Sequence, residues 1–133
     1  ASSPQLLESF LKPLVDAGVD AFHCSQRRFW EPEFEGSDMN LAGWVKKLTG
    51  MPTITVGSVS LDQDFISQTS EGDGAESKPA SIDRLLEMLD RGDFDLVAVG
   101  RALIANPDWP KVVRSGDTLG LRAFSKDQLA TLD

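Results

Sequence analysis

The chain has 133 residues, 41% of them hydrophobic and 26% charged, a composition typical of a globular domain that can form a core. Its formal net charge of -8 disfavours a nucleic-acid or membrane-surface partner, because both need clustered Lys and Arg. No apolar run reaches the roughly 18 residues of a membrane span. Cys24 is the only cysteine, which excludes an internal disulfide and fits a reducing, cytoplasmic location.

The first predicted element is a helix that begins at Ser3-Pro4, where a serine cap precedes a proline in the first turn. Apolar residues recur at helical spacing as far as Gly18, which is suited to end the helix. Pro13 lies inside this run and predicts a kink or an interruption. A strand over 19–24 and a long loop over 25–37, rich in charged and aromatic residues, follow.

Two further helix–strand pairs are predicted next. A helix over 40–48 precedes a strand over 52–56. A second helix, capped by Ser81 and ended by Gly92, precedes a strand over 94–99. Helices therefore alternate with strands along the chain.

The remaining segments are less regular. Residues 67–80, rich in Ser, Glu and Gly, predict a mobile surface loop. Pro107 and Pro110 bracket a turn before a short helix over 111–114, and 125–128 has the spacing of a capping box for a last helix.

The alternation of helices and strands indicates an α/β fold. Glycines at 18, 50 and 92 each stand just before a strand, a weak internal repeat of βα units. The strands lack clean polar alternation, which favours a parallel sheet buried on both faces. We expect residues 1–133 to form part of a single TIM-barrel domain, with about three parallel strands and flanking helices. The barrel is incomplete, because closure needs eight strands and about 250 residues.

Two strand-to-loop junctions predict a phosphate site. Gly57 and Ser58 follow one strand, and Gly100 and Arg101 follow the next. Together they offer backbone N–H groups, a hydroxyl and a guanidinium, the groups that bind phosphate, and TIM barrels commonly bind phosphate after their last two strands. Alternatively, each glycine merely turns the chain and Arg101 pairs with a surface acid.

The loop after the first strand holds the other candidate residues. Phe29 and Trp30 would line a pocket for a planar ligand or plug the loop against the core. His23 is the only histidine, and neither it nor Cys24 has a partner at an evident catalytic spacing, so we expect structural roles for both. The sequence predicts no catalytic residue and no metal site.

Three stretches resemble the C-terminal part of the Old Yellow Enzyme family. They are Gly-Val-Asp-Ala-Phe-His-Cys-Ser at 18–25, Thr-Val-Gly-Ser at 55–58 and the run at 95–109. The most specific is Val-Gly-Arg-Ala-Leu-Ile-Ala-Asn-Pro-Asp-Trp within the last run. The family comprises FMN-dependent NADH:flavin oxidoreductases, or ene-reductases, built on a TIM barrel. The resemblance covers nearly the whole chain, with 67–80 as an insertion.

The resemblance implies a role for each candidate residue. Gly57, Ser58, Gly100 and Arg101 would hold the FMN phosphate, while Phe29 and Trp30 would shape the substrate space over the flavin. In the family, reduced FMN gives a hydride to an activated alkene, and NAD(P)H reduces the flavin again. The proton-donating residues come from earlier strands, so the isolated chain is expected to be inactive.

Two other functions stay open. The chain would be a barrel fragment that holds a phosphorylated metabolite without flavin, or a non-catalytic fragment. In the second case its open sheet edges would pair with another copy or with the missing N-terminal part of the barrel.

Overall fold

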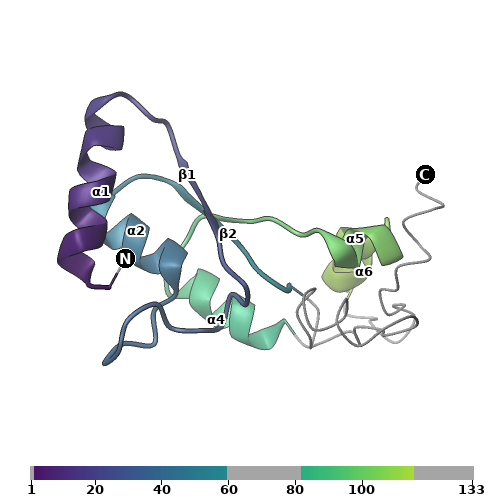
Figure 1. Cartoon of the computed structure of the whole chain (residues 1–133). Helices are drawn as coiled ribbons and strands as arrows, with labels where there is room; N and C mark the ends of the chain where they lie inside the picture. The colour runs from purple at the N-terminus through teal and green to yellow at the C-terminus, as the bar shows by residue number, and fades with distance from the viewer. Residues whose placement is uncertain (1, 60–81, 116–133) are drawn as a thin grey trace, which may run out of the picture. The chain divides into compact units, whose positions relative to one another are not determined.

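The computed structural model describes residues 2–59 and 82–115 of the chain. The elements in chain order are α1 (Pro4–Asp16), β1 (Phe22–Ser25), α2 (Leu41–Thr49), β2 (Thr53–Val56), α4 (Asp83–Asp90), β3 (Leu96–Val97), α5 (Arg101–Ala105) and α6 (Trp109–Ser115) (Figure 1). The predicted alternation of helices and strands is confirmed through the third strand. The predictions of a loop over 67–80 and a helix after 125 lie outside the described residues.

The three strands form one parallel sheet in the order β1-β2-β3. Phe22 of β1 lies opposite Thr53 of β2, and Ile54 lies opposite Leu96 of β3. The predicted open sheet of three parallel strands with flanking helices is therefore confirmed. The third strand is shorter than the predicted 94–99, because only two of its residues pair with β2.

The two faces of the sheet differ in exposure. One face carries Cys24, Thr53 and Thr55, all buried, and α2 packs on both β1 and β2. At alternating positions, His23 is exposed and Leu96 keeps 61% of its surface exposed. The expectation of burial on both faces is therefore wrong for this chain, because the described helices cover one face only.

The first helix continues through its internal proline. The Ser3 hydroxyl accepts from the Leu6 N–H at 3.2 Å, as predicted for its N-cap. Pro13 lies inside α1, which runs on to Asp16. Of the predicted kink or interruption, the interruption is therefore wrong, and the kink stays a prediction. Proline removes its own N–H donor, but the next turn still closes through the Ala17 N–H and the Pro13 carbonyl at 3.0 Å.

The helix-ending glycines are confirmed. Gly18, Gly50 and Gly92 have φ values of 96°, 70° and 85°, in the left-handed region that glycine enters without a steric penalty. At the end of α1 the Gly18 N–H donates to Val15 and the Val19 N–H donates back to Leu14, the bond pattern of a Schellman turn. The repeat seen in the sequence is thus a repeated way of ending a helix before a strand.

The described residues fall into two compact units. Among them, one unit holds residues 2–57 and 83–98, and the other holds residues 58–59, 82 and 99–115. The first holds the sheet and a core that includes Ala42, Val45, Leu85, Met88 and Phe94. The second holds α5, which the sequence did not predict, and α6, which begins two residues before the expected helix. Among the described helices, none is long and apolar enough to cross a membrane.

Candidate functional site

The junction after β2 has a backbone that only glycine fits. Gly57 has φ 154°, and a Cβ there would collide with the Gln26 carbonyl oxygen and lie 3.0 Å from the Phe29 nitrogen. The Phe29 N–H donates to the Gly57 carbonyl at 3.0 Å. The close neighbour that excludes a side chain at Gly57 is therefore the protein's own loop after β1.

Ser58, the next residue, is left-handed although it is not a glycine. Its φ is 52° and only 7% of its surface is exposed. Such a conformation costs about 1–3 kcal/mol and occurs often at ligand sites. Nothing in the sequence pattern around Ser58 signalled this backbone.

The side chains of the two predicted phosphate junctions meet within the second unit. The Arg101 Nη2 donates to the Ser58 Oγ at 3.3 Å. Gly100, just before Arg101, has φ -108°, and no heavy atom of residues 2–59 or 82–115 lies within 4 Å of a Cβ placed there. Among the described residues, the space beside Gly100 is therefore open, whereas the space beside Gly57 is occupied by the loop after β1.

The two aromatic candidates pack against each other. The rings of Phe29 and Trp30 meet edge to face with their centroids 5.1 Å apart, and Phe29 is 3% exposed while Trp30 is half-buried. The Gln26 side chain fastens this loop, because its Nε2 donates to the Glu31 carbonyl at 2.7 Å and its Oε1 accepts from the Leu41 N–H at 3.2 Å. The loop after β1 is thus tied to the start of α2.

A residue that the sequence analysis did not single out lies at the centre of these contacts. Asn40 is fully buried and caps α2 through its Oδ1, which accepts from the Gly43 N–H at 3.0 Å. Its Nδ2 donates to the Phe29 carbonyl at 3.0 Å and to the Thr55 Oγ1 at 3.1 Å. An Asn before a helical run signals an N-cap, but nothing in that local signal reveals the two distant partners.

Cys24 and His23, both in β1, do not form a nucleophilic site. Burial raises the pKa of the Cys24 thiol to about 11, so the reactive thiolate is scarce near neutral pH. Cys24 is 5% exposed, which confirms the prediction of a packed residue. His23 stands exposed on the other face of the strand.

At the opposite end of the sheet, the carboxylate of Asp95, just before β3, bonds to both α2 and β2. Asp95 accepts from the Lys46 Nζ at 2.8 Å and from the Thr53 N–H at 2.9 Å. These two bonds, led by that of Lys46, hold the pKa of Asp95 below its usual value. Asp95 lies where the strands begin, whereas Ser58 and Arg101 lie after strand ends, so its contacts are structural.

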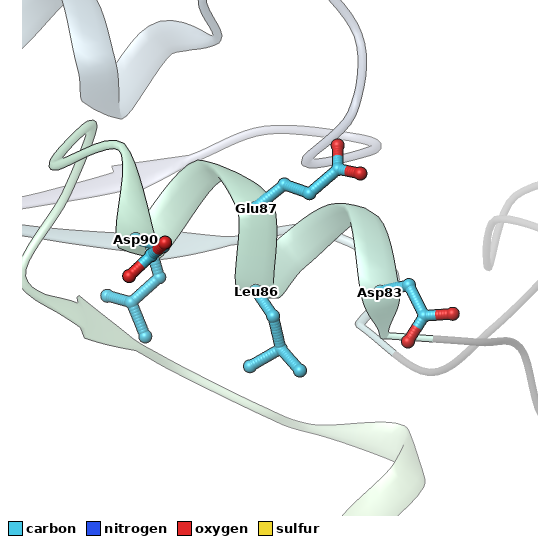
Figure 2. A pocket seen from close by; sticks show the side chains of 5 residues that line it. Asp83, Leu86, Glu87 and Asp90 are labelled. Atoms are coloured by element: carbon cyan, nitrogen blue, oxygen red, sulfur yellow. The ribbon is translucent and has the colours of Figure 1, made fainter.

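A shallow hollow along α4 stands apart from the candidate residues. It is lined by Asp83, Leu86, Glu87, Leu89 and Asp90, and Figure 2 shows carboxylates and leucine side chains projecting from this one helix. No predicted site residue lines it. The hollow therefore adds nothing to the phosphate or pocket predictions.

Comparison with known proteins finds similarity both in sequence and in fold. The chain is 34% identical over 113 residues to the NADH oxidase of Thermoanaerobacter brockii, an alignment that covers 79% of this chain and 14% of that protein. Its fold matches morphinone reductase with a TM-score of 0.51 at 21% identity, covering 85% of this chain and 24% of that one. No protein-family model matches.

The two matches agree with the resemblance read from the sequence. The chain spans about one seventh of the curated relative, 14% of its length. Morphinone reductase, an Old Yellow Enzyme, shares the fold, so the three-stranded parallel sheet corresponds to part of a TIM barrel. The chain thus resembles a fragment of an Old Yellow Enzyme-like flavin oxidoreductase, and its sheet corresponds to part of the barrel.

Proposed function

We propose that the chain is the FMN-phosphate-binding portion of an NAD(P)H-dependent flavin oxidoreductase that reduces activated alkenes. The observation that carries the proposal is the 3.3 Å contact between the Arg101 guanidinium and the Ser58 hydroxyl. It joins a cation from the junction after β3 to a hydroxyl from the junction after β2. A phosphate dianion favours such a pair, because hydrogen bonds from a charged donor are about twice as strong as neutral ones.

The residues present fit a phosphate group. Ser58 is buried and held in a strained backbone, and Gly100 leaves open space where a side chain would stand. In this proposal Arg101 binds the phosphate charge and Ser58 donates its hydroxyl and N–H. Gly57 lets the loop after β1 pack close to the junction, and Gly100 leaves room for the phosphate. Strain of this kind is a recurrent feature of ligand clamps.

The loop after β1 supplies one wall of the substrate space in this proposal. Phe29 is buried and fixes the loop, while the half-buried Trp30 presents ring surface beside it. The bound flavin supplies the hydride chemistry, with NAD(P)H as reductant. The chain itself positions the phosphate and shapes the pocket. Without a proton donor from other strands it is inactive alone, and the lone, buried Cys24 fits a cytoplasmic location.

The test is titration of the chain with FMN and with riboflavin, which lacks the phosphate, followed by quenching of flavin fluorescence. We expect Arg101→Ala to weaken FMN binding by about 1.5–3 kcal/mol, the value of a hydrogen bond to a charged group, and to leave riboflavin binding unchanged. Arg101→Lys should recover part of the loss, because it keeps the charge without the guanidinium fork.

Arg114→Ala is the matched control, since Arg114 is an exposed arginine of α6 in the same unit. It should leave both affinities unchanged. Absence of FMN binding by the wild-type chain, or equal FMN binding by wild type and Arg101→Ala, contradicts the proposed function.

A further inference from the structure

We propose that Asn40 is a positioning residue that couples the loop bearing Phe29 to the phosphate-binding peptide between Gly57 and Ser58. The inference rests on the proposed function, because it assigns Asn40 to the same phosphate site. It concerns a residue that does not touch the ligand. Asn40 acts through two hydrogen bonds in series, one from its side chain to the Phe29 carbonyl and one from the Phe29 N–H to the Gly57 carbonyl.

The contacts of Asn40 fix its side chain completely. The Oδ1 faces the Gly43 N–H at 3.0 Å, so the amide nitrogen must point the other way. That nitrogen has two hydrogens, and one goes to the Phe29 carbonyl at 3.0 Å and the other to the Thr55 hydroxyl at 3.1 Å. In a fully buried position each of these bonds matters, because water cannot replace a lost partner.

The backbone of Phe29 links Asn40 to Gly57. Its carbonyl accepts from Asn40, and its N–H donates to the Gly57 carbonyl at 3.0 Å. The loop also presses against the Gly57 Cα, where even a methyl group would collide with the Gln26 carbonyl. Movement of Phe29 is therefore transmitted directly to Gly57.

The last step follows from the planarity of the peptide bond. The Gly57 carbonyl and the Ser58 N–H belong to one trans peptide and point in opposite directions. Because Phe29 holds that carbonyl, it also aims the Ser58 N–H away from the loop. The Ser58 N–H is one of the proposed phosphate donors, so Asn40 sets its direction through Phe29.

If Asn40 served only as the N-cap of α2, variants that keep a capping oxygen would leave the Phe29 loop unchanged. Asn40→Asp keeps the oxygen that caps α2, since Asp and Asn are equally good N-caps, but it cannot donate to Phe29. Asn40→Ser also keeps a capping oxygen and avoids a buried charge, so it serves as a second variant. Gly50→Ala is the matched control, because it strains the other end of α2, at φ 70°, with no neighbour within 4 Å of the new methyl.

The experiment measures two quantities in the wild-type chain and these three variants. Amide hydrogen exchange at Phe29 reports its bond to Gly57, and fluorescence titration compares FMN with riboflavin. Both Asn40 variants should speed exchange at Phe29 about tenfold and weaken FMN about tenfold, with riboflavin unchanged, as expected for one lost buried bond. Gly50→Ala should change neither quantity.

The outcomes separate this inference from the proposed function. The coupling is overturned if the Phe29 amide exchanges no faster in both Asn40 variants than in Gly50→Ala. This holds whether or not the chain binds FMN. Faster exchange with unchanged FMN affinity overturns its link to the phosphate. Faster exchange in a chain whose wild type binds no FMN refutes the proposed function while the coupling of Asn40 to Gly57 stands.

Discussion

At the scale of single residues, the two candidate junctions use glycine for different reasons. Gly57 is required by the protein's own chain, since the loop at Gln26 fills the space of its side chain. At Gly100, none of the described residues comes near the position that a side chain would take. Both positions are glycine in the sequence. Only the structure therefore distinguishes a glycine required by packing from one that leaves room for a ligand.

Gly57→Ala should therefore be costly. The new methyl would meet the Gln26 carbonyl in a backbone conformation that L-residues avoid, so we expect a loss of roughly 2–4 kcal/mol in the free energy of unfolding. Gly18→Ala is the control, because Gly18 also has a positive φ but no neighbour within 4 Å, and it should lose only about 1 kcal/mol. Urea unfolding of both variants measures the difference, and equal losses would contradict the packing argument.

At the scale of elements, helices were easier to predict than strands. Serine caps, apolar spacing and terminal glycines are local signals, and α1 begins and ends where they indicated. The extent of β3 was not predictable, because pairing depends on a partner distant in sequence. The same limit applies to the site. Ser58 and Arg101 were both predicted, but the contacts of Asn40 with Phe29 and Thr55 exist only in the folded arrangement.

The contacts of Asp95 predict how the stability of the fold depends on pH, because this carboxylate joins Lys46 of α2 to the start of β2. Its pKa is lowered on folding, so its contribution is present above the unfolded pKa and is lost as pH falls through the folded pKa. Asp95 is 40% exposed, which limits the Lys46 pair to about 0.2–1 kcal/mol.

Asp95→Asn should thus be less stable than wild type at about pH 7, and the gap should narrow as the pH falls below the usual aspartate pKa of 3.8. Urea unfolding of both chains over a series of decreasing pH values measures the gap. A gap that stays constant or widens in acid would show that the charge of Asp95 is not what stabilises the junction.

At the scale of the whole molecule, several large apolar side chains lie on the surface. Leu6, Phe10 and Leu14 follow one another at four-residue spacing on α1, and Phe10 is 67% exposed. Leu96 of β3 is also exposed. Exposed apolar stripes of this kind commonly mark contact surfaces. Association with another copy, or with the rest of a barrel, stays a prediction.

Phe10→Glu tests whether the chain associates with another copy of itself through α1. It places a charge in the middle of the α1 stripe, so it should lower the average mass of the chain in sedimentation velocity across a concentration series. Ser9→Glu adds the same charge on an exposed neighbour outside the stripe and should leave association unchanged. A wild-type chain that is monomeric at every concentration would refute self-association through α1.

The order of strand pairing has a consequence for how the chain acquires its shape. Phe22 pairs with Thr53, whereas Ile54 must find Leu96 across a longer stretch of chain. Longer loops cost more entropy to close, and β3 offers two paired residues against the four of β1. We expect β1, α2 and β2 to form the folding nucleus and β3 to join last. Ser58 follows β2 and Arg101 follows β3, so these two residues meet only after β3 has joined the sheet. A phosphate that bridges them should therefore slow unfolding and leave the rate of folding almost unchanged.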